Sequence, residues 1–502
     1  MLRFSRTYAT KPLHQLKCGI EIHTQLNTKS KLFSLSSNNA FNSDPNTFIS
    51  YFDIGLPGTQ PKLNNEALLY ALKLSKALQC DVNLDSSFDR KHYFYGDQPL
   101  GYQITQHFSP IAKNGKLEIL PELDGVKEPL TVEIEQLQIE QDTGKSVYVT
   151  ETATEETVSK IDLNRANLPL IEMVTKPNFT DSNQVKVFIK KFQNLVRYLD
   201  ICTGDLETGA MRIDVNVSVD GFQRVELKNL STTSSVMNAI KYEFQRQVKL
   251  IEAGRGDEII IETRGWDGSK TNSLRNKESS LDYKYFPDPE LPHILLDKSV
   301  MEELQLPELP DQVLSKLINK PYSLSLKDAT ILTYDLDLLR YYLDLFDLAV
   351  ISNGVKNSKL PGNFVIHEIL GNFSKLNMRF DPELIPVAKI NELVQLIDNG
   401  TISNSSAKLL LQHLFNNNED ISRPLSELID EFDLRKEETV DNDQELVSVC
   451  QEIINENEKT VKNLKKKPNG LKFLVGQAMR VTQGKVNAAE FERVFKGLLN
   501  VE

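Results

Sequence analysis

The chain has 502 residues, and its 58 lysines and arginines against 70 aspartates and glutamates give a formal net charge of −12. This acidic balance excludes a protein that coats nucleic acid through bulk positive charge, although it is compatible with a local basic patch. The length corresponds to about two to four domains. The sequence has no run of about 18 apolar residues, so we predict no membrane span. Its four cysteines form no C-x-x-C pair, so we predict no zinc ribbon.

The N-terminal segment differs in composition from the rest of the chain. It has no acidic residue before position 21, whereas it contains Arg3, Arg6, Lys11 and Lys17. An acid-free start that combines arginines with hydroxylated residues is typical of a mitochondrial transit peptide. We therefore expect residues 1–16 to be a presequence and the protein to be located in the mitochondrial matrix. A short disordered tail is the alternative.

Residues 17–299 carry mixed strand and helix signals. Apolar and polar side chains alternate over 18–26, 211–219 and 225–230, and this period of two predicts half-buried strands.

Two amphipathic helices are predicted in the same region. Apolar residues recur at helical spacing over 185–199, and Asp181 or Ser182 is the expected N-cap. A second helical pattern covers 237–251 and ends before Gly254.

From about residue 300 the strand signal fades, and leucine-rich stretches separated by prolines predict helices. We therefore predict an α+β protein with an antiparallel or mixed sheet in residues 17–299. An all-helical domain over 300–380 and a small helical tail domain over 381–502 are expected to follow it.

Charge is segregated near the C-terminus. Residues 419–458 hold 14 acids and 3 bases, whereas 459–480 hold 7 bases, including Lys465, Lys466 and Lys467, and no acid. A solvated helix face explains most such runs. A contact with a phosphate backbone is the alternative for the basic one.

Two strand patterns place acidic and imidazole groups on polar faces. Glu21 and His23 alternate on one strand and could share a divalent cation, although His23 alone is more simply a hydrogen-bonded surface residue. Asp214 and Glu226 lie on the polar faces of two further predicted strands. Carboxylates that converge on one sheet face repel one another unless a cation offsets their charge, which indicates a magnesium site.

The run Gly144-Lys145-Ser146 invites comparison with a P-loop. That motif needs a glycine five residues before Gly144, where this chain has Ile139. The backbone cradle for phosphate is therefore missing, and we reject a P-loop. Glu140, at the end of an alternating run, is a candidate metal ligand.

Seven segments in a fixed order carry a resemblance to a known family. Together they resemble the B subunits of the glutamyl-tRNA(Gln) amidotransferases, and the likeness covers essentially everything after the presequence. The segments are 19–26, 88–95, 137–146, 161–177, 225–230, 282–289 and 474–479.

The resemblance implies an activity. Such a protein is expected to hold ATP, Mg²⁺ and the acceptor end of Glu-tRNA(Gln), and to transfer the γ-phosphoryl group to the glutamate side-chain carboxylate. Ammonia that an A-type amidase partner releases from glutamine then displaces phosphate, which makes the complex a carbon–nitrogen ligase. A small third subunit, of the C type or the fungal F type, completes the expected heterotrimer, and no zinc is expected. The resemblance also makes 17–299 the catalytic cradle, 300–380 a helical linker and 381–502 a tRNA-binding tail.

The resemblance also implies site residues. The catalytic positions are Glu21, His23, Glu140, Asp214 and Glu226. The metal ligands are Glu21, His23, Glu140, Gln141 and Glu226, of which Gln141 stands where the family has a second acid. The candidate phosphate or substrate contacts are Lys145, Arg165 and Lys228, although Lys145 and Arg165 could equally be structural ion-pair partners. The candidate tRNA contacts in the tail are Lys465, Lys466, Lys467 and Lys472.

Asn167 stands where the family has glycine, which predicts a left-handed backbone conformation that asparagine tolerates. Gln141 leaves a rival hypothesis open, since a neutral side chain in place of an acid fits a non-catalytic tRNA-binding scaffold of the same assembly. A free-standing carboxylate kinase is a further alternative. An archaeal-type relative is excluded because the chain lacks room for its insert.

Overall fold

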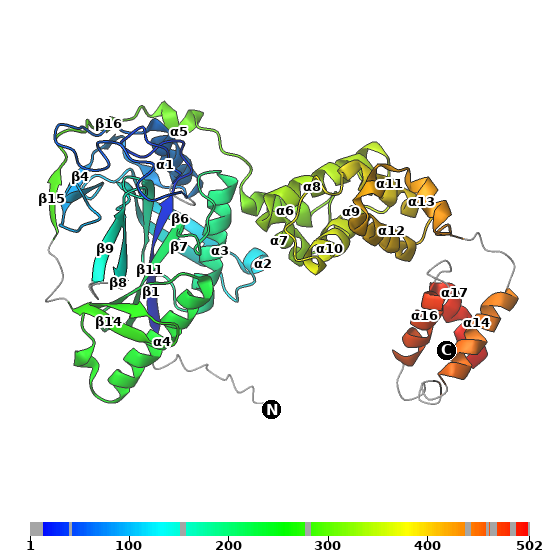
Figure 1. The fold of residues 1–502 in the computed structure, drawn as a ribbon. Helices are drawn as coiled ribbons and strands as arrows, with labels where there is room; N and C mark the ends of the chain where they lie inside the picture. The colour runs from blue at the N-terminus through cyan, green and yellow to red at the C-terminus, as the bar shows by residue number, and fades with distance from the viewer. Residues whose placement is uncertain are drawn as a thin grey trace. The chain divides into compact units, whose positions relative to one another are not determined.

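The computed structural model describes residues 14–39, 43–150, 157–276, 283–436, 443–457, 461, 469–481 and 488–499. By internal contacts it divides into two units, Met1–Gln312 and Val313–Glu502. A large sheet lies in the first unit and helices form the second (Figure 1). The α+β class expected from the sequence is confirmed.

The first unit is built around a nine-stranded sheet in the order β14-β13-β12-β11-β1-β10-β7-β6-β2. Neighbouring strands run antiparallel except β12 and β13, which are parallel, so the sheet is mixed. The strands are β1 (Leu16–Gln25), β2 (Asp81–Val82), β6 (Ala112–Ile119), β7 (Leu130–Gln141), β10 (Pro169–Thr175), β11 (Met211–Val219), β12 (Val225–Lys228), β13 (Glu262–Trp266) and β14 (Thr271–Asn276).

The three predicted strands form at the centre of this sheet. Strand β11 has the predicted bounds, and every second residue from Met211 to Val219 is buried. Strand β12 ends at Lys228, two residues earlier than expected. Strand β1 begins at Leu16, so the sheet already includes the last residue of the segment 1–16 that we assigned to the presequence.

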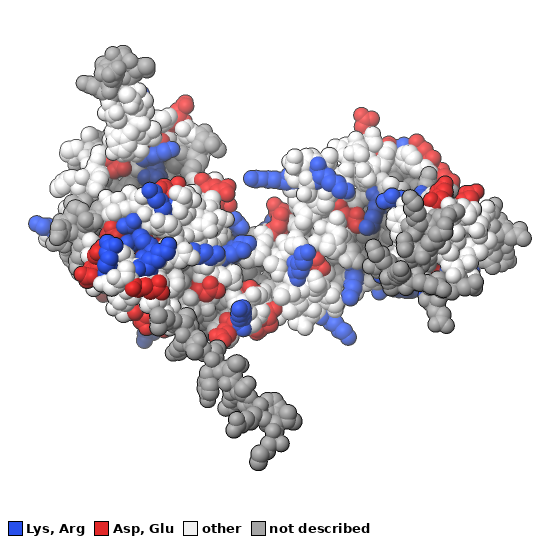
Figure 2. Space-filling model, turned by 90° about the horizontal axis from the view of Figure 1, so that it is seen from below, with Lys and Arg blue, Asp and Glu red and all other residues white. Residues whose placement is uncertain are grey.

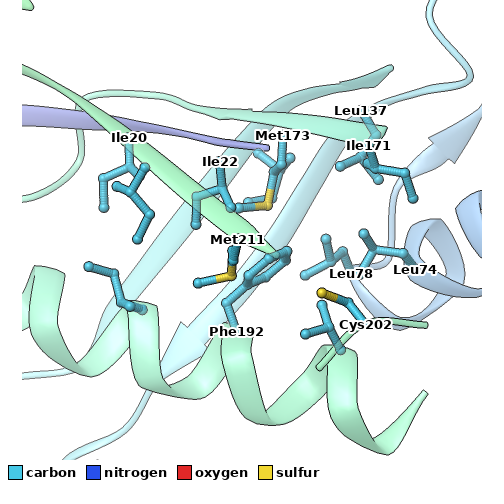
Figure 3. Packing of buried hydrophobic residues seen from close by; sticks show 14 of the residues in the cluster. Ile20, Ile22, Leu74, Leu78, Leu137, Ile171, Met173, Phe192, Cys202 and Met211 are labelled. Carbon is cyan, nitrogen blue, oxygen red and sulfur yellow. The ribbon is translucent and has the colours of Figure 1, made fainter. Parts of the chain in front are cut away.

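Helices cover one face of the sheet. Helix α3 (Ser182–Tyr198) begins at the expected N-cap, Asp181, whose side chain accepts a hydrogen bond from the Asn183 backbone N–H. Helix α4 (Thr233–Glu252) packs against α3 and β11, and α1 (Asn65–Ala77) adds to the same core. Figure 3 shows Phe192 of α3 pointing at the apolar side of the strands. Its ring is fully buried, and removing it would cost about 3–5 kcal/mol of stability.

The apolar side of β1 faces these helices, so its alternate residues face the other way. Ile20 and Ile22 point toward the helical layer (Figure 3), whereas Glu21 and His23 are only partly buried. The helix-free face of the sheet is therefore the polar one.

Smaller elements complete the first unit. A three-stranded sheet in the order β15-β4-β5 joins residues far apart in the chain, and β8 pairs with β9. The short elements are α2 (Pro121–Asp124), α5 (Ser299–Glu303), β3 (Asp85–Ser86), β4 (Asp89–His92), β5 (Tyr102–Thr105), β8 (Lys145–Thr150), β9 (Thr157–Asp162), β15 (Lys284–Pro287) and β16 (Ile294–Leu295).

The second unit is helical in its described part. Helices α14, α16 and α17 pack together around Cys450, Leu474 and Phe491. The helices are α6 (Pro310–Ile318, which begins in the first unit), α7 (Leu326–Tyr334), α8 (Leu336–Phe346), α9 (Leu360–Asn363), α10 (Leu370–Lys375), α11 (Val387–Asp398), α12 (Asn404–Asn416), α13 (Leu425–Glu431), α14 (Asp443–Glu456), α16 (Asn469–Val481) and α17 (Ala488–Leu499).

The contact division differs from the expected boundaries at 299 and 380. Leucines after α5, including Leu304 and Leu309, pack against the first core and carry that unit to Gln312. The Tyr341 hydroxyl of α8 donates to the Ile385 carbonyl at 2.9 Å, so helices on both sides of 380 pack in one unit. No helix in the described part of the chain is long and apolar enough to cross a membrane.

Charged side chains of both signs lie on the surface of the first unit (Figure 2). On the face shown in Figure 2, acidic and basic side chains of the first unit lie next to one another. The net charge of −12 therefore coexists with local positive groups.

Candidate active site on the open face of the sheet

A polar cavity of about 250 Å³ lies on the helix-free face of the large sheet. Eight ionisable side chains line it: Glu21, His23, Lys91, Glu140, Asp142, Arg212, Asp214 and Lys228. Both signs of charge meet in a small volume, which is typical of a site that binds a charged ligand.

Strand register brings the acids of this cavity together. Glu21 of β1 lies opposite Asp214 of β11, and His23 lies opposite Glu172 of β10. Strand β7 follows β10 in the sheet and adds Glu140. Opposite and alternate residues of an antiparallel sheet share a face, so four strands deliver their polar groups to one side.

His23 stands at the centre of this cluster. Its Nε2 lies 3.3 Å from Glu140 Oε1, 3.6 Å from Glu21 Oε1 and 3.9 Å from Glu172 Oε2. Two groups of three side chains, Glu21–His23–Asp214 and His23–Glu140–Glu172, each hold ligand atoms within 4.8 Å of one another.

The cluster perturbs its own proton affinities. Burial alone would lower the pKa of His23, but its hydrogen bond with Glu140 and the charges of Glu140, Glu172 and Glu21 outweigh burial and raise it to about 9. Burial and the neighbouring Glu140 carboxylate raise the pKa of Glu172 well above its usual range. Bound protons therefore reduce the repulsion between the carboxylates that crowd around this imidazole, and a divalent cation can replace those protons.

These donors fit a hard divalent cation. Carboxylate oxygens from Glu21, Asp214, Glu140 and Glu172 converge around His23, and such oxygens are the ligands that Mg²⁺ prefers. The imidazole of His23 adds one nitrogen donor. The donor atoms of these residues are thus of the kind that a magnesium site requires.

Three cations surround the acids. Lys228 Nζ contacts Asp214 and lies 3.1 Å from Glu226 Oε1, and these carboxylates raise the pKa of Lys228 against the opposing effect of burial. Arg212 Nη2 lies 3.0 Å from Asp142 Oδ1. With Lys91 they offer positive charge to an anionic group in the cavity.

A buried polar network supports the loop that carries Asp142. Asn167 has φ = 66°, which confirms the left-handed conformation predicted for it. Its backbone N–H donates to the Asp142 carbonyl at 2.8 Å, and its Nδ2 donates to Asp53 Oδ1 at 2.9 Å. Asp53 pairs with Lys31 at 3.2 Å, and both side chains are fully buried. Arg165 donates to the Thr143 and Gly144 carbonyls of the same loop.

The structure separates the predicted site residues into groups. Glu21, His23, Glu140, Asp214 and Lys228 line the cavity. Glu226, which was predicted to bind the metal, is in neither group of candidate ligands; it lies at the edge of the cavity, where it meets Lys228 and accepts a hydrogen bond from Thr263 Oγ1 at 2.7 Å. Arg165 does not line the cavity and instead donates hydrogen bonds to two carbonyls of a loop, which favours a structural role over a contact with phosphate or substrate.

Two further predictions do not match the geometry. Gln141 was expected to bind the metal, but alternation along β7 turns it to the face opposite Glu140, and its Nε2 donates to the Tyr102 carbonyl at 3.4 Å. Lys145 was expected near phosphate, but it is exposed at the start of β8 and does not line the cavity.

The predicted tRNA contacts lie elsewhere in the chain. Lys472 is exposed on α16. Lys465, Lys466 and Lys467 lie outside the described residues.

Sequence reasoning missed four ionisable groups of the site. Glu172 interrupts the apolar run of β10, and that interruption was the available signal. Arg212 shares the polar face of β11 with Asp214 and could have been found by the same alternation. Asp142 follows Glu140 by two positions, so the alternation that selected Glu140 could also have found it, whereas Lys91 reaches the cavity through tertiary contacts that no spacing reveals.

Comparisons with known proteins show the family of the chain. A family model described as the GatB/GatE catalytic domain matches residues 16–302, and one described as the GatB domain matches 344–499. Curated relatives include the mitochondrial glutamyl-tRNA(Gln) amidotransferase subunits B of Kluyveromyces lactis, 52% identical, and Saccharomyces cerevisiae, 50% identical; in both, the match covers 100% of this chain and 100% of the relative. That of Scheffersomyces stipitis is 52% identical over 98% of this chain and 96% of its own. The chain therefore belongs to the GatB/GatE family of tRNA-dependent amidotransferase subunits.

Proposed function

We propose that this chain activates the glutamate of Glu-tRNA(Gln) within a mitochondrial tRNA-dependent amidotransferase. It uses Mg–ATP to phosphorylate the side-chain carboxylate, and ammonia then replaces phosphate to leave Gln-tRNA(Gln). The observation that carries the proposal is the joint placement of a cation-binding acid cluster and three basic side chains in one cavity.

The chemistry explains why both charges are needed. A carboxylate is a poor electrophile, so one of its oxygens first attacks the γ-phosphorus of ATP and ADP leaves. Ammonia next attacks the activated carbonyl carbon, the bond to the phosphate oxygen breaks, and the nitrogen loses a proton. The first step brings two anionic groups together, and in the second step an anionic phosphate leaves, so the protein contributes mainly position and charge neutralisation.

Roles follow from the contacts. Glu21, His23, Asp214 and Glu140 would hold Mg²⁺, with Glu172 as a further donor. When bound, that ion neutralises negative charge on the phosphates. Lys228, Arg212 and Lys91 supply positive charge beside these acids, where each pairs with an acid or an aromatic ring.

The partners are part of the proposal. Glutamine is the amido donor, and an A-type amidase partner would release ammonia from it. A small third subunit, of the C type or the fungal F type, would complete a heterotrimer. The relatives named above are mitochondrial, in agreement with the location expected from the N-terminal composition.

A single-turnover assay of the assembled complex tests this proposal. Supplying ammonium chloride with Mg–ATP and Glu-tRNA(Gln) bypasses the amidase. Glu140→Gln should lose amidation at least about 100-fold, as expected when a charged group at a metal site is removed, while glutaminase activity persists.

Glu133→Gln is the matched control. Glu133 lies on the same strand but pairs with Lys176 outside the cavity, so this variant should match the wild type. Full amidation by Glu140→Gln would overturn the assignment of this cavity as the active site.

A further inference from the structure

Aromatic side chains gather on the small sheet beside the catalytic cavity. In its register, Tyr285 of β15 lies opposite Lys91 of β4, and Lys91 lies opposite Gln103 of β5. Lys91 and Gln103 line the cavity, so Tyr285 shares the sheet face that is directed toward it. Tyr283 precedes Tyr285 by two positions, and Lys91 Nζ lies 4.7 Å from the centroid of the Tyr283 ring.

Further rings extend this surface away from the cavity. The His107 ring stacks on Tyr285 with centroids 3.9 Å apart and an interplanar angle of 15°. Phe108 packs edge-on against His107 at 4.9 Å and is 56% exposed. We call these four side chains, Tyr283, Tyr285, His107 and Phe108, the aromatic wall. Tyr283 and Tyr285 are partly exposed and His107 and Phe108 exposed, and such rings next to a charged cavity present a flat apolar surface that a ligand can cover.

We propose that the aromatic wall stacks the unpaired bases at the 3′ end of the substrate tRNA, with the terminal adenosine against the Tyr285–His107 pair. The inference rests on the proposed function and deepens it. Single-stranded nucleic acid is bound by aromatic rings that stack successive bases and by nearby cations that meet the phosphates. The wall offers both, since Lys91 Nζ lies over the Tyr283 ring and Tyr285 is opposite Lys91 in the strand register.

The position of the wall fits an aminoacyl-tRNA. The glutamyl group is esterified to the terminal ribose, so the terminal base and the reacting carboxylate must occupy neighbouring subsites. Tyr285 and the acid cluster meet this condition, because Tyr285 lies opposite Lys91, which lines the same cavity as Glu140. The wall has several rings in succession, which suits consecutive bases of a strand better than the single base of ATP.

The opposite face of the same small sheet provides a control. Phe286 follows Tyr285 on β15 and points to the other side, where it packs against His92 with centroids 5.3 Å apart. It is 54% exposed. Phe286→Leu therefore removes a ring from the same strand, about as exposed as that of Phe108, without touching the wall.

Equilibrium binding of uncharged tRNA(Gln) to the assembled complex tests the proposal, using intact tRNA and tRNA that lacks the terminal adenosine. Tyr285→Leu should weaken binding of intact tRNA about 5- to 150-fold, the range for loss of one stacked base, and leave binding of the trimmed tRNA unchanged. Tyr285→Phe, which keeps the ring, and Phe286→Leu should both bind intact tRNA like the wild type.

Two further measurements separate the possible failures. If Tyr285→Leu does not fold, Phe108→Leu carries the test, because that ring is already mostly exposed and its loss should also weaken intact tRNA severalfold. Equal losses for intact and trimmed tRNA, or a raised KM for ATP with tRNA binding unchanged, overturn the assignment. Binding needs no turnover, so these results stand apart from the ammonium-driven amidation that tests the proposed function.

Discussion

His23 Nε2 lies 3.3 Å from Glu140 Oε1, although the two residues come from strands β1 and β7, which are separated in the sheet by β10. Glu172 of the intervening strand β10 faces the same side and lies near both side chains. An imidazole thus bridges carboxylates from three strands, and this arrangement governs how the site responds to protons and metal.

Metal affinity should depend on pH in the range where His23 titrates. In the metal-free protein the pKa of His23 is about 9, so a metal that binds this nitrogen must displace a proton below that pH. The apparent affinity for Mg²⁺ or Mn²⁺ should therefore rise up to about tenfold per pH unit from pH 7 toward 9. Calorimetry in buffers of different ionisation enthalpy measures the released proton directly.

The His23→Asn variant is the control for that experiment, because it keeps a polar ligand and removes the titration. Its metal affinity should be weaker and nearly flat with pH. A flat profile in the wild type would show that His23 does not bind the metal.

The free energy of unfolding of the metal-free protein should also depend on pH through His23. The folded pKa of His23 lies above the ordinary histidine value of 6.5, so its stabilising contribution is complete below pH 6.5 and is lost as the pH rises through about 9. Urea unfolding with chelator should show a fall in the free energy of unfolding over this window. His23→Asn should remove that fall, and an identical pH profile in both proteins would contradict the assignment.

Substitution of Asn167 should separate backbone strain from hydrogen bonding. Asn167→Val places a β-branched residue at φ = 66° and removes the hydrogen bond to Asp53, so it should cost about 2–4 kcal/mol. Asn167→Gly keeps the conformation and loses only the hydrogen bond, at about 1–2 kcal/mol. Chemical unfolding measures both, and equal losses would show that the left-handed backbone carries no strain.

The buried pair Lys31–Asp53 should be more costly to break than to replace. Both side chains are fully buried, and Asp53 also accepts from the Ser34 hydroxyl and the Ser50 backbone N–H. Lys31→Met leaves a buried carboxylate without its cation and should destabilise by about 3–5 kcal/mol. The double variant Lys31→Met/Asp53→Asn, which removes both charges, should recover part of that loss; a double variant that is less stable than Lys31→Met would refute this account.

The basic run before α16 should contribute to tRNA binding through charge. Reversing Lys465, Lys466 and Lys467 to glutamate should weaken tRNA affinity and lower the slope of log affinity against log salt concentration. The matched control reverses three other lysines of the second unit, Lys316, Lys320 and Lys327. Unchanged affinity at several salt concentrations would remove the tail from the tRNA-binding surface.

Local patterns in the sequence account for much of the fold. The alternation in β11 and the apolar stripe of α3 were each readable, because half-buried strands and helices place apolar residues at periods of two and 3.6. The cap at Asp181 and the left-handed Asn167 were readable for a similar reason, since both depend on the residue and its immediate neighbours.

The sequence predicted only part of the site. Glu21, His23, Glu140 and Asp214 followed from polar faces and from family resemblance, and the cavity brings them together. The same alternation that selected Glu140 should have excluded Gln141 from the metal, because neighbouring residues of a strand face opposite sides.

The sequence by itself determined which residues are strand, helix and polar face, since these properties are set by near neighbours along the chain. Only the tertiary structure decided that β10 lies between β1 and β7, which adds Glu172 to the cluster. It also decided that Lys91 enters from a separate small sheet and that Lys31 is buried against Asp53. Strand order and long-range pairing depend on how distant segments share one core, and no local period in the sequence records that choice.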